Sequence, residues 1–261
     1  QWTCLPGIEG HVSARSHDVF FFWGQHDIQI ALDSDCVSKH MLVSGCFLTG
    51  RSNPQACASA KSVVSRFRKL GARYVLTIFD TSSPTPNFYR FLLEWLISDP
   101  GLGLLIKSKC CRTWADVIRL HGGSSLDYNF GESLQSAIDT QRIHLMPSNV
   151  SPVDVALVSD FTLGIGTLSS TAVAALQGGR VFFVDYERLD QGPQSPYAIF
   201  HSLGLNRCIF YDLETLKKEV LKYASNPKNN PHLGDPSPIL HRLDSFCDGG
   251  ASRRIAEYVE W

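Results

Sequence analysis

The sequence lacks a long apolar run and has little charge. Among 261 residues, of which 44% are hydrophobic, no stretch of 18 apolar residues occurs, so no membrane-spanning helix is expected. No signal peptide is expected either, because the charged residues around His17–Asp18 interrupt the first apolar stretch. Charged residues make up 19% and the net charge is −1, which excludes a disordered chain and argues against a nucleic-acid partner.

Several motifs are also missing. No CxxC pair occurs among the eight cysteines, so their spacing does not fit zinc, and we interpret them as reduced thiols of a cytoplasmic protein. The sequence contains no GKS or GKT phosphate loop, no GxGxxG and no GxSxG. Asp33-Ser34-Asp35 has the DxD pattern of a metal-bound diphosphate site. It lies in a turn-like setting, so we interpret it as a solvated turn and expect no metal.

Eight short apolar runs are present, and their residues do not alternate with polar ones. This pattern is typical of strands that are covered on both faces, and it predicts a parallel sheet. The predicted strands are Asp18–Trp23, Met41–Ser44, Tyr74–Phe79, Leu102–Ile106, Ile143–Met146, Val153–Val158, Val181–Val184 and Cys208–Tyr211.

Helical patterns separate these strands. Asn53 followed by Pro54 predicts a helix start, and Gly71 predicts its end. Further helices are predicted over Pro86–Ser98, Thr113–Leu120, Ser133–Ile138, Ser169–Gln177, Leu213–Ala224 and Gly249–Trp261. Because strands and helices alternate from residue 72 to 212, the fold class is predicted to be α/β, a Rossmann-like, doubly wound and mainly parallel sheet.

The chain divides into two predicted parts. Residues 1–55 form an amino-terminal segment, irregular at first, with two strands that are either extra strands of the main sheet or the remnant of a preceding domain. Residues 56–261 form the Rossmann-like domain with its carboxyl-terminal helix. The Pro- and Asn-rich stretch 226–238 is predicted to be a long surface loop.

Candidate binding residues follow two of the predicted strands, where ligands bind in open α/β sheets. Glycines allow a ligand to approach the backbone closely, and hydroxyls with free amides at a helix start bind anions. The loop after the predicted strand Val153–Val158 has both features. Its phosphate-binding candidates are Gly164, Gly166, Thr167, Ser169, Ser170 and Thr171. The alternative that Ser169 only caps the helix stays open. Lys107 and Lys109 are predicted to point the same way and to offer positive charge to a diphosphate.

Seven segments together resemble a known family. They are HDVFFFWGQHD (17–27), HMLVSGCF (40–47), YVLTIFD (74–80), LGLLIKSK (102–109), RIHLM (142–146), the block 151–185 and CDGGASRRIAEYVEW (247–261). From about Asp18 onward the chain resembles the carboxyl-terminal, donor-binding half of GT-B glycosyltransferases, and more closely those of bacterial surface and capsular polysaccharide biosynthesis.

The resemblance implies a nucleotide sugar as substrate and no cofactor. The region matching Gly164–Thr171 would bind its phosphates, assisted by Lys107 or Lys109. The region matching Ile143–Asn149 would frame the base, which makes His144, Ser148 and Asn149 candidates. The Ser169-Ser170 pair is similar to the serine pair of sialyl- and Kdo-type transferases that use CMP-sugars.

The sequence also departs from the family. The helix after the phosphate loop carries no glutamate to hold the ribose, so Asp185 or Glu187 would take that role. A histidine-proline pair is missing, and Lys107-Ser108-Lys109 stands in its place. The catalytic base of such enzymes comes from the amino-terminal half, so no catalytic residue is assigned. We expect a preceding acceptor domain, since the chain begins at Gln1 rather than Met.

The resemblance leaves three functions open. The first is transfer of a sugar to a glycan or lipid-linked acceptor of a surface polysaccharide, in the cytoplasm or at the inner face of the membrane. The second is a non-catalytic nucleotide-binding module of a polysaccharide synthase. The third is an enzyme similar to sugar-nucleotide 2-epimerases.

Overall fold

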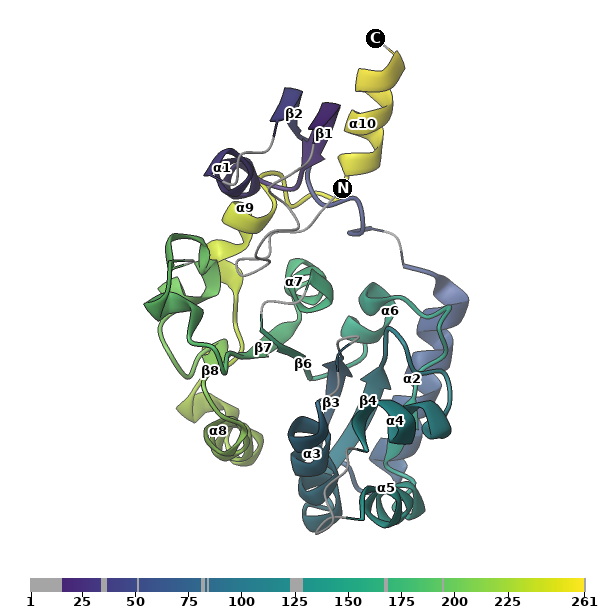
Figure 1. Ribbon diagram of the computed structural model, residues 1–261. Coiled ribbons are helices and arrows are strands. Elements are labelled where there is room, and N and C mark those ends of the chain that lie inside the picture. Colours follow the sequence, from purple (N-terminus) through teal and green to yellow (C-terminus); the bar gives the residue numbers. More distant parts are fainter. Residues whose placement is uncertain are drawn as a thin grey trace.

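The main sheet has six parallel strands. The computed structural model describes residues 16–33, 37–50, 52–80, 83, 85–122, 129–166, 169–193 and 195–260. Within them, the strands run in the order β5-β4-β3-β6-β7-β8 (Figure 1). Their bounds are β3 (Tyr74–Phe79), β4 (Leu102–Lys107), β5 (Ile143–Leu145), β6 (Phe161–Ile165), β7 (Arg180–Val184) and β8 (Ile209–Phe210). The predicted doubly wound, parallel α/β fold is therefore confirmed.

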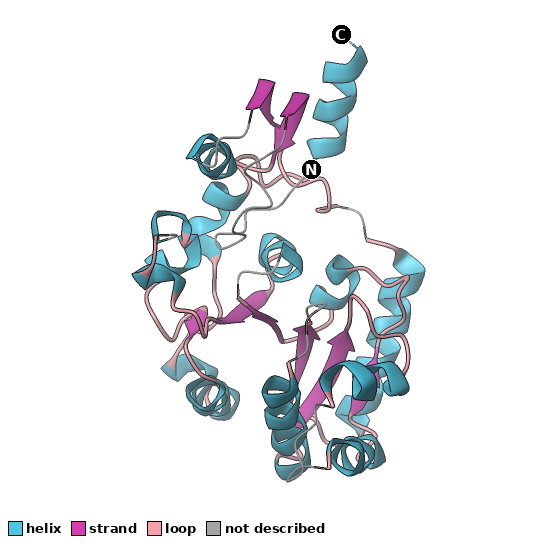
Figure 2. Cartoon of the chain, viewed as in Figure 1, coloured by secondary structure: helices cyan, strands magenta, loops and turns pink. Residues whose placement is uncertain are grey.

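Helices cover both faces of this sheet (Figure 2). Leu76 and Ile78 of β3 pack in the cluster that contains α3, α5 and α8, whereas Val75 packs toward α2. Phe79 joins a third cluster, with α7. The helices are α2 (Pro54–Lys69), α3 (Pro86–Ser98), α4 (Trp114–His121), α5 (Phe130–Asp139), α6 (Pro152–Ala156), α7 (Ser169–Leu176) and α8 (Leu213–Ser225). Covering both faces removes the apolar strand residues from water, as their continuous pattern predicted.

One predicted strand is a helix. The residues of 153–158 mostly lie in α6, and the strand falls instead at β6, which the sequence analysis placed in a loop. Ser151 and Asp154 form a capping box, and Pro152 occupies the first helical turn. The Asp154 carboxylate is buried and also accepts the Asn53 N–H at 2.8 Å. A short, mostly apolar segment does not by itself distinguish a strand from a buried helix. Here the capping box favours the helix.

The amino-terminal strands form a sheet of their own. β1 (Ser16–Phe22) and β2 (Val37–Val43) pair in parallel and are joined by α1 (Gln25–Asp33), a helix that the sequence analysis missed. The alternative that they extend the main sheet is therefore wrong. The carboxyl-terminal helices α9 (Leu240–Leu243) and α10 (Ala251–Glu260) return to this unit (Figure 1), where the Tyr258 ring lies 5.6 Å from that of Phe21. We call β1, α1 and β2 the small unit; the division at residue 55 stays a prediction.

Asp244 joins the small unit to the returning chain. Its buried carboxylate accepts the N–H of Cys46 at 2.9 Å, of Phe246 at 2.9 Å and of Cys247 at 3.0 Å. Gly45 has φ +86, and a Cβ there would come within 2.9 Å of the Asp244 carboxylate. The joint therefore requires both the acid and the glycine.

The expectations for the loop 226–238 and for the cysteines are met in part. The loop 226–238 is not confined to the surface, because Leu233 is fully buried and the Gly234 carbonyl accepts the Val181 N–H at 2.8 Å. The six described cysteines are unpaired, and Cys110 and Cys247 are exposed. In the described part of the chain, no helix is both long and apolar enough to cross a membrane.

Arg142 holds the end of α3 against the start of β4. Its buried guanidinium donates to the carbonyls of Leu96 at 3.1 Å, Asp99 at 2.8 Å and Leu102 at 2.6 Å. Arg142→Met should lower the free energy of unfolding by about 2–4 kcal/mol in urea denaturation, since buried carbonyls lose their donor. Arg119→Met is the matched control, because that side chain is 79% exposed and a surface ion pair contributes about 0–1 kcal/mol. Equal losses would contradict this assignment.

Candidate functional site

The strand order reverses between β3 and β6. From β3 the chain leaves through α3 on one face, and from β6 it leaves through α7 on the other. Phe79 pairs with Lys107 of β4 and with Gly164 of β6, so the carboxyl ends of these three strands lie level. Ligands of open α/β sheets bind at such a reversal. The candidate site is therefore this edge of the sheet.

The turn from β6 to α7 leaves room for a ligand. Gly166 directly follows β6, has φ +59 and donates its N–H to the Val184 carbonyl at 2.8 Å. A Cβ on Gly166 would meet no atom of the described residues within 4 Å, so the space beside it is open with respect to that part of the chain. Gly164 lies inside β6 and is buried, so its predicted place in the loop is wrong. Thr167 and the side chain of Ser169 lie outside the described residues.

The first turn of α7 carries three hydroxyl residues, and the side chains of two of them, Ser170 and Thr171, are described. Ser170 is half-buried. Thr171 is fully buried, and its Oγ1 has no hydrogen-bond partner among the described residues. A helix start also presents free N–H groups and the positive end of the helix dipole. The turn therefore has the features of an anion site.

α7 itself is buried on two sides. Ala172 and Val173 pack with Trp23 of the small unit, whereas Ala174 and Ala175 pack with the main sheet (Figure 1). This double packing explains why the helix carries no glutamate: a carboxylate there would be buried without a partner.

Lys107 and Lys109 lie in different local structures, the first at the end of a strand and the second in the bend after it. Lys107 ends β4, and its Nζ donates to the carbonyls of Pro147 and Ser148, each at 3.3 Å. Burial lowers the pKa of Lys107, and the charge of Asp80 opposes that shift. The chain then turns, because the Ser108 hydroxyl accepts the N–H groups of the next two cysteines. Lys109 is exposed and lies beyond the end of β4, so the strand alternation from which a common direction was predicted does not extend to it.

Asp80 is a residue that the sequence analysis did not select. It follows β3 at the strand reversal and is buried. Its carboxylate accepts the Tyr89 hydroxyl and the Lys109 N–H, each at 2.9 Å. Burial alone would raise the pKa of Asp80, but hydrogen bonds from His121, Ser108, Lys109 and Tyr89 lower it below the usual value. An acid directly after a central buried strand was the available signal.

The other base and ribose candidates are dispersed. Ser148 and Asn149 are exposed in the loop after β5, beside Lys107. His144 lies inside β5; burial, and then the charge of Arg66, lower its pKa. Glu187 is exposed. The structure thus brings Ser148 to Lys107 and leaves His144 within the edge strand.

Asp185 directly follows β7 and already accepts hydrogen bonds from the chain. Its buried Oδ2 accepts the Leu189 N–H and His201 Nε2, each at 2.8 Å. Asp185 therefore fixes local structure. His201, which the sequence analysis also did not select, lies 3.8 Å from Asp190 as well.

Among the described residues, two clusters bring together side chains that could bind a metal ion. In Asp80–Cys111–His121, the Thr85 N–H donates to His121 Nδ1 at 3.2 Å, whereas a neutral histidine that binds metal through Nε2 needs a proton on Nδ1. Burial also raises the pKa of the Cys111 thiol. In Asp185–Asp190–His201, protein donors already bind both carboxylates. Neither donor set calls for a metal, and the expectation of none stays a prediction.

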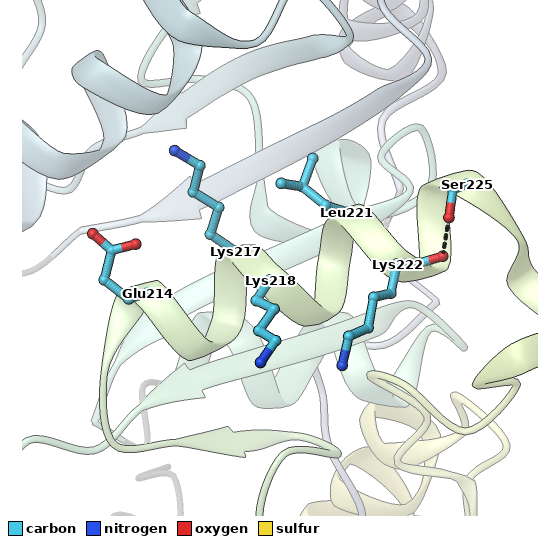
Figure 3. A pocket seen from close by; sticks show the side chains of 6 residues that line it. All are labelled: Glu214, Lys217, Lys218, Leu221, Lys222 and Ser225. Carbon is cyan, nitrogen blue, oxygen red and sulfur yellow. Dashed lines mark hydrogen bonds between the residues drawn. The ribbon is translucent and has the colours of Figure 1, made fainter.

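A hollow along α8 lies apart from these groups. It is lined by Glu214, Lys217, Lys218, Leu221, Lys222 and Ser225, all on one helix. In Figure 3, Lys217 points to one side of α8 and Lys218 and Lys222 to the other. Lys217 lies 5.7 Å from the Phe91 ring. None of the phosphate or ribose candidates lines this hollow.

Comparison with known proteins identifies the fold. No protein-family description matches the chain, and no curated protein matches its sequence. A variant of the wall teichoic acid polymerase TagF superposes with a TM-score of 0.57 at 15% identity, covering 93% of this chain and 57% of that one. A TagF variant soaked with CDPG gives 0.55 at 15% identity, covering 93% and 56%.

A third structure is Anabaena Alr3699/HepE in complex with UDP and glucose. It gives a TM-score of 0.52 at 10% identity, covering 93% of this chain and 63% of that one. These neighbours are GT-B glycosyltransferases, and at such identities they show that this chain shares their fold. The chain spans less than two thirds of each of them.

Asp80 should make stability depend on acid pH. Because its folded-state pKa is lowered, its contribution is complete above about pH 4, the ordinary aspartate pKa, and is lost as pH falls toward the folded value. Thermal unfolding of Asp80→Asn should show a lower Tm at pH 7 and a shallower decline below pH 4. Asp139→Asn is the control on an exposed acid. If the Tm of Asp80→Asn falls as steeply below pH 4 as that of wild type, Asp80 does not cause the acid dependence of stability.

Proposed function

We propose that this chain is the donor-binding part of a metal-independent glycosyltransferase. It binds a nucleotide-activated sugar with the phosphates at the start of α7. The observation that carries this proposal is the turn at the strand reversal, where open space beside Gly166 meets a helix start with the unpartnered Thr171 hydroxyl. Both features suit a phosphate group, which offers acceptors to free N–H and O–H donors.

Lys107 supplies the positive charge of this proposal. It lies two strands from Gly164, which is about 10 Å at the usual strand spacing. Its side chain extends on the side of the sheet that holds Leu105 and α2, since β4 alternates. An ammonium group at this edge would offset the charge that develops on the leaving diphosphate as the glycosidic bond breaks.

The neighbours support a nucleotide-activated donor. The TagF structure was soaked with CDPG, and the HepE structure holds UDP and glucose. We propose a surface-polysaccharide acceptor, glycan or lipid-linked, that is reached in the cytoplasm at the inner membrane face. A preceding acceptor domain would complete the enzyme. The small unit supports this, because a two-stranded sheet is marginal alone and here has only two described strands.

A thermal-shift series tests donor binding. The chain is heated with CMP, CDP, UDP, GDP, ADP or dTDP, each in large excess. A ligand that binds only the folded chain adds about 2.7 kcal/mol at a hundredfold excess over its Kd, which raises the Tm. We expect one nucleotide to raise the Tm selectively. No shift with any of them would contradict a donor site in this chain.

Thr171→Val tests the position of the phosphate. The substitution removes a buried hydroxyl that has no described partner, so stability should stay equal or rise by up to about 1 kcal/mol. Affinity for the nucleoside diphosphate should fall roughly three- to tenfold, the value of one hydrogen bond. Titration calorimetry measures the affinity and urea denaturation the stability.

Thr140→Val is the matched control. The Thr140 hydroxyl donates to the Ala137 carbonyl at 2.6 Å and accepts the Arg142 N–H at 3.2 Å, away from the carboxyl edge. It should therefore lower stability and leave nucleotide affinity unchanged. Unchanged affinity in Thr171→Val would remove Thr171 from the site.

A further inference from the structure

His201 presents a buried ring nitrogen without a described partner. It lies on the 3-10 helix η3 (Ile199–Leu203), which packs through Phe200 onto Phe183 of β7 with ring centroids 4.3 Å apart. The imidazole is 8% exposed. Its Nε2 lies 2.8 Å from Asp185 Oδ2, whereas Nδ1 has no hydrogen-bond partner among the described residues. Buried polar atoms are nearly always paired, so this one requires a partner outside the described chain.

The proton arrangement defines what that partner is. A carboxylate only accepts hydrogen bonds, so Nε2 carries the proton that it donates to Asp185. When the ring is neutral, this arrangement leaves Nδ1 as an acceptor. Its partner must therefore be a donor, such as a hydroxyl or an N–H group. A phosphate oxygen, which is itself an acceptor, does not fit the neutral ring.

The ring contacts Asp185, which follows the strand next to the phosphate turn. The Gly166 N–H donates to the Val184 carbonyl, and Asp185 follows Val184 directly. Neighbouring strands lie about 4.8 Å apart. The carboxylates of Asp185 and Asp190 also gather here, within 2.8 Å and 3.8 Å of Nε2. Their charge repels phosphates, so this end of β7 favours an uncharged part of a ligand that binds with its phosphates at α7.

We infer that His201 Nδ1 accepts a hydrogen bond from a hydroxyl of the nucleotide-activated donor, and that Asp185 is the positioning residue that orients the ring. This inference rests on the proposed function. It gives the donor a direction along the sheet edge, with the phosphates at the start of α7 and a hydroxyl-bearing ring over β7. The hydroxyl belongs either to the ribose or to the transferred sugar.

Two amide substitutions of His201 test the contributions of the two ring nitrogens one at a time. His201→Asn places a polar atom near the position of Nδ1, whereas His201→Gln reaches the position of Nε2 and keeps the contact with Asp185. Each variant is titrated with UDP, CDP, their 2′,3′-dideoxy analogues and UDP-glucose. We expect His201→Gln to weaken binding roughly three- to tenfold, the value of one lost hydrogen bond, and His201→Asn to stay within about twofold of wild type.

The ligands distinguish the source of the hydroxyl. If the ribose supplies it, the dideoxy analogues bind wild type and His201→Gln equally. If the transferred sugar supplies the hydroxyl, only UDP-glucose binds wild type and His201→Gln with different affinities. In a ¹⁵N spectrum of the histidine ring, the Nδ1 signal of wild type should shift when the ligand binds. Asp185→Asn should move the ring proton toward Nδ1, which the same spectrum reports, and should weaken the same ligands.

Several outcomes would overturn the inference. Wild-type affinity in His201→Gln, or equal affinity in both variants, would mean that the ring is structural and that Nδ1 holds a trapped water. His241→Gln, on an exposed histidine, controls for nonspecific loss, and the Tm of each variant reports folding. If Thr171→Val weakens binding while His201→Gln does not, only this inference fails. If wild type binds none of the ligands, the proposed function fails and this inference fails with it.

Discussion

The burial of the main sheet on both faces is the constraint on which the rest of the structure depends. Its central strands β3 and β4 are mostly apolar and are buried along nearly their whole length, so water must be excluded from both sides. Right-handed crossovers achieve this only if the chain first builds outward from β3 to β5 and then returns to β6 on the other side of β3. That return places two strand ends side by side with their connections on opposite faces, and it leaves the edge between them free for a ligand.

Buried acids organise the loops around this edge and around the joint to the small unit. Asp80, Asp154 and Asp244 each accept backbone N–H groups, so their charges are compensated within the chain. Thr171 and His201 differ, because each retains a buried polar atom without a described partner. Trp23, Trp95 and His121 also carry such an atom, so what distinguishes Thr171 and His201 is their place on α7 and beside β7, on one side of the strand reversal.

The packing of α7 links the small unit to the site. Because the helix is covered by the main sheet and by Trp23, its positions after Thr171 are small and apolar. An acidic ribose contact cannot arise from this helix at neutral pH without a buried charge. In the proposed donor complex, a hydroxyl-binding group would therefore come from a neighbouring element, and η3, which packs on β7, is such an element.

The sequence by itself determined the fold class, most strand and helix positions, and the turn at Gly166, because apolar period and capping residues are local signals. It misplaced β6 and missed α1, since short apolar runs are ambiguous until tertiary contacts such as Asp154 to Asn53 select one structure. Only the tertiary structure decided which polar groups meet. Asp80 and His201 became recognisable only in the structure, because burial and the partner of each atom depend on residues outside the local segment. Asp185 was already a candidate from the sequence, and the structure shows that it binds His201.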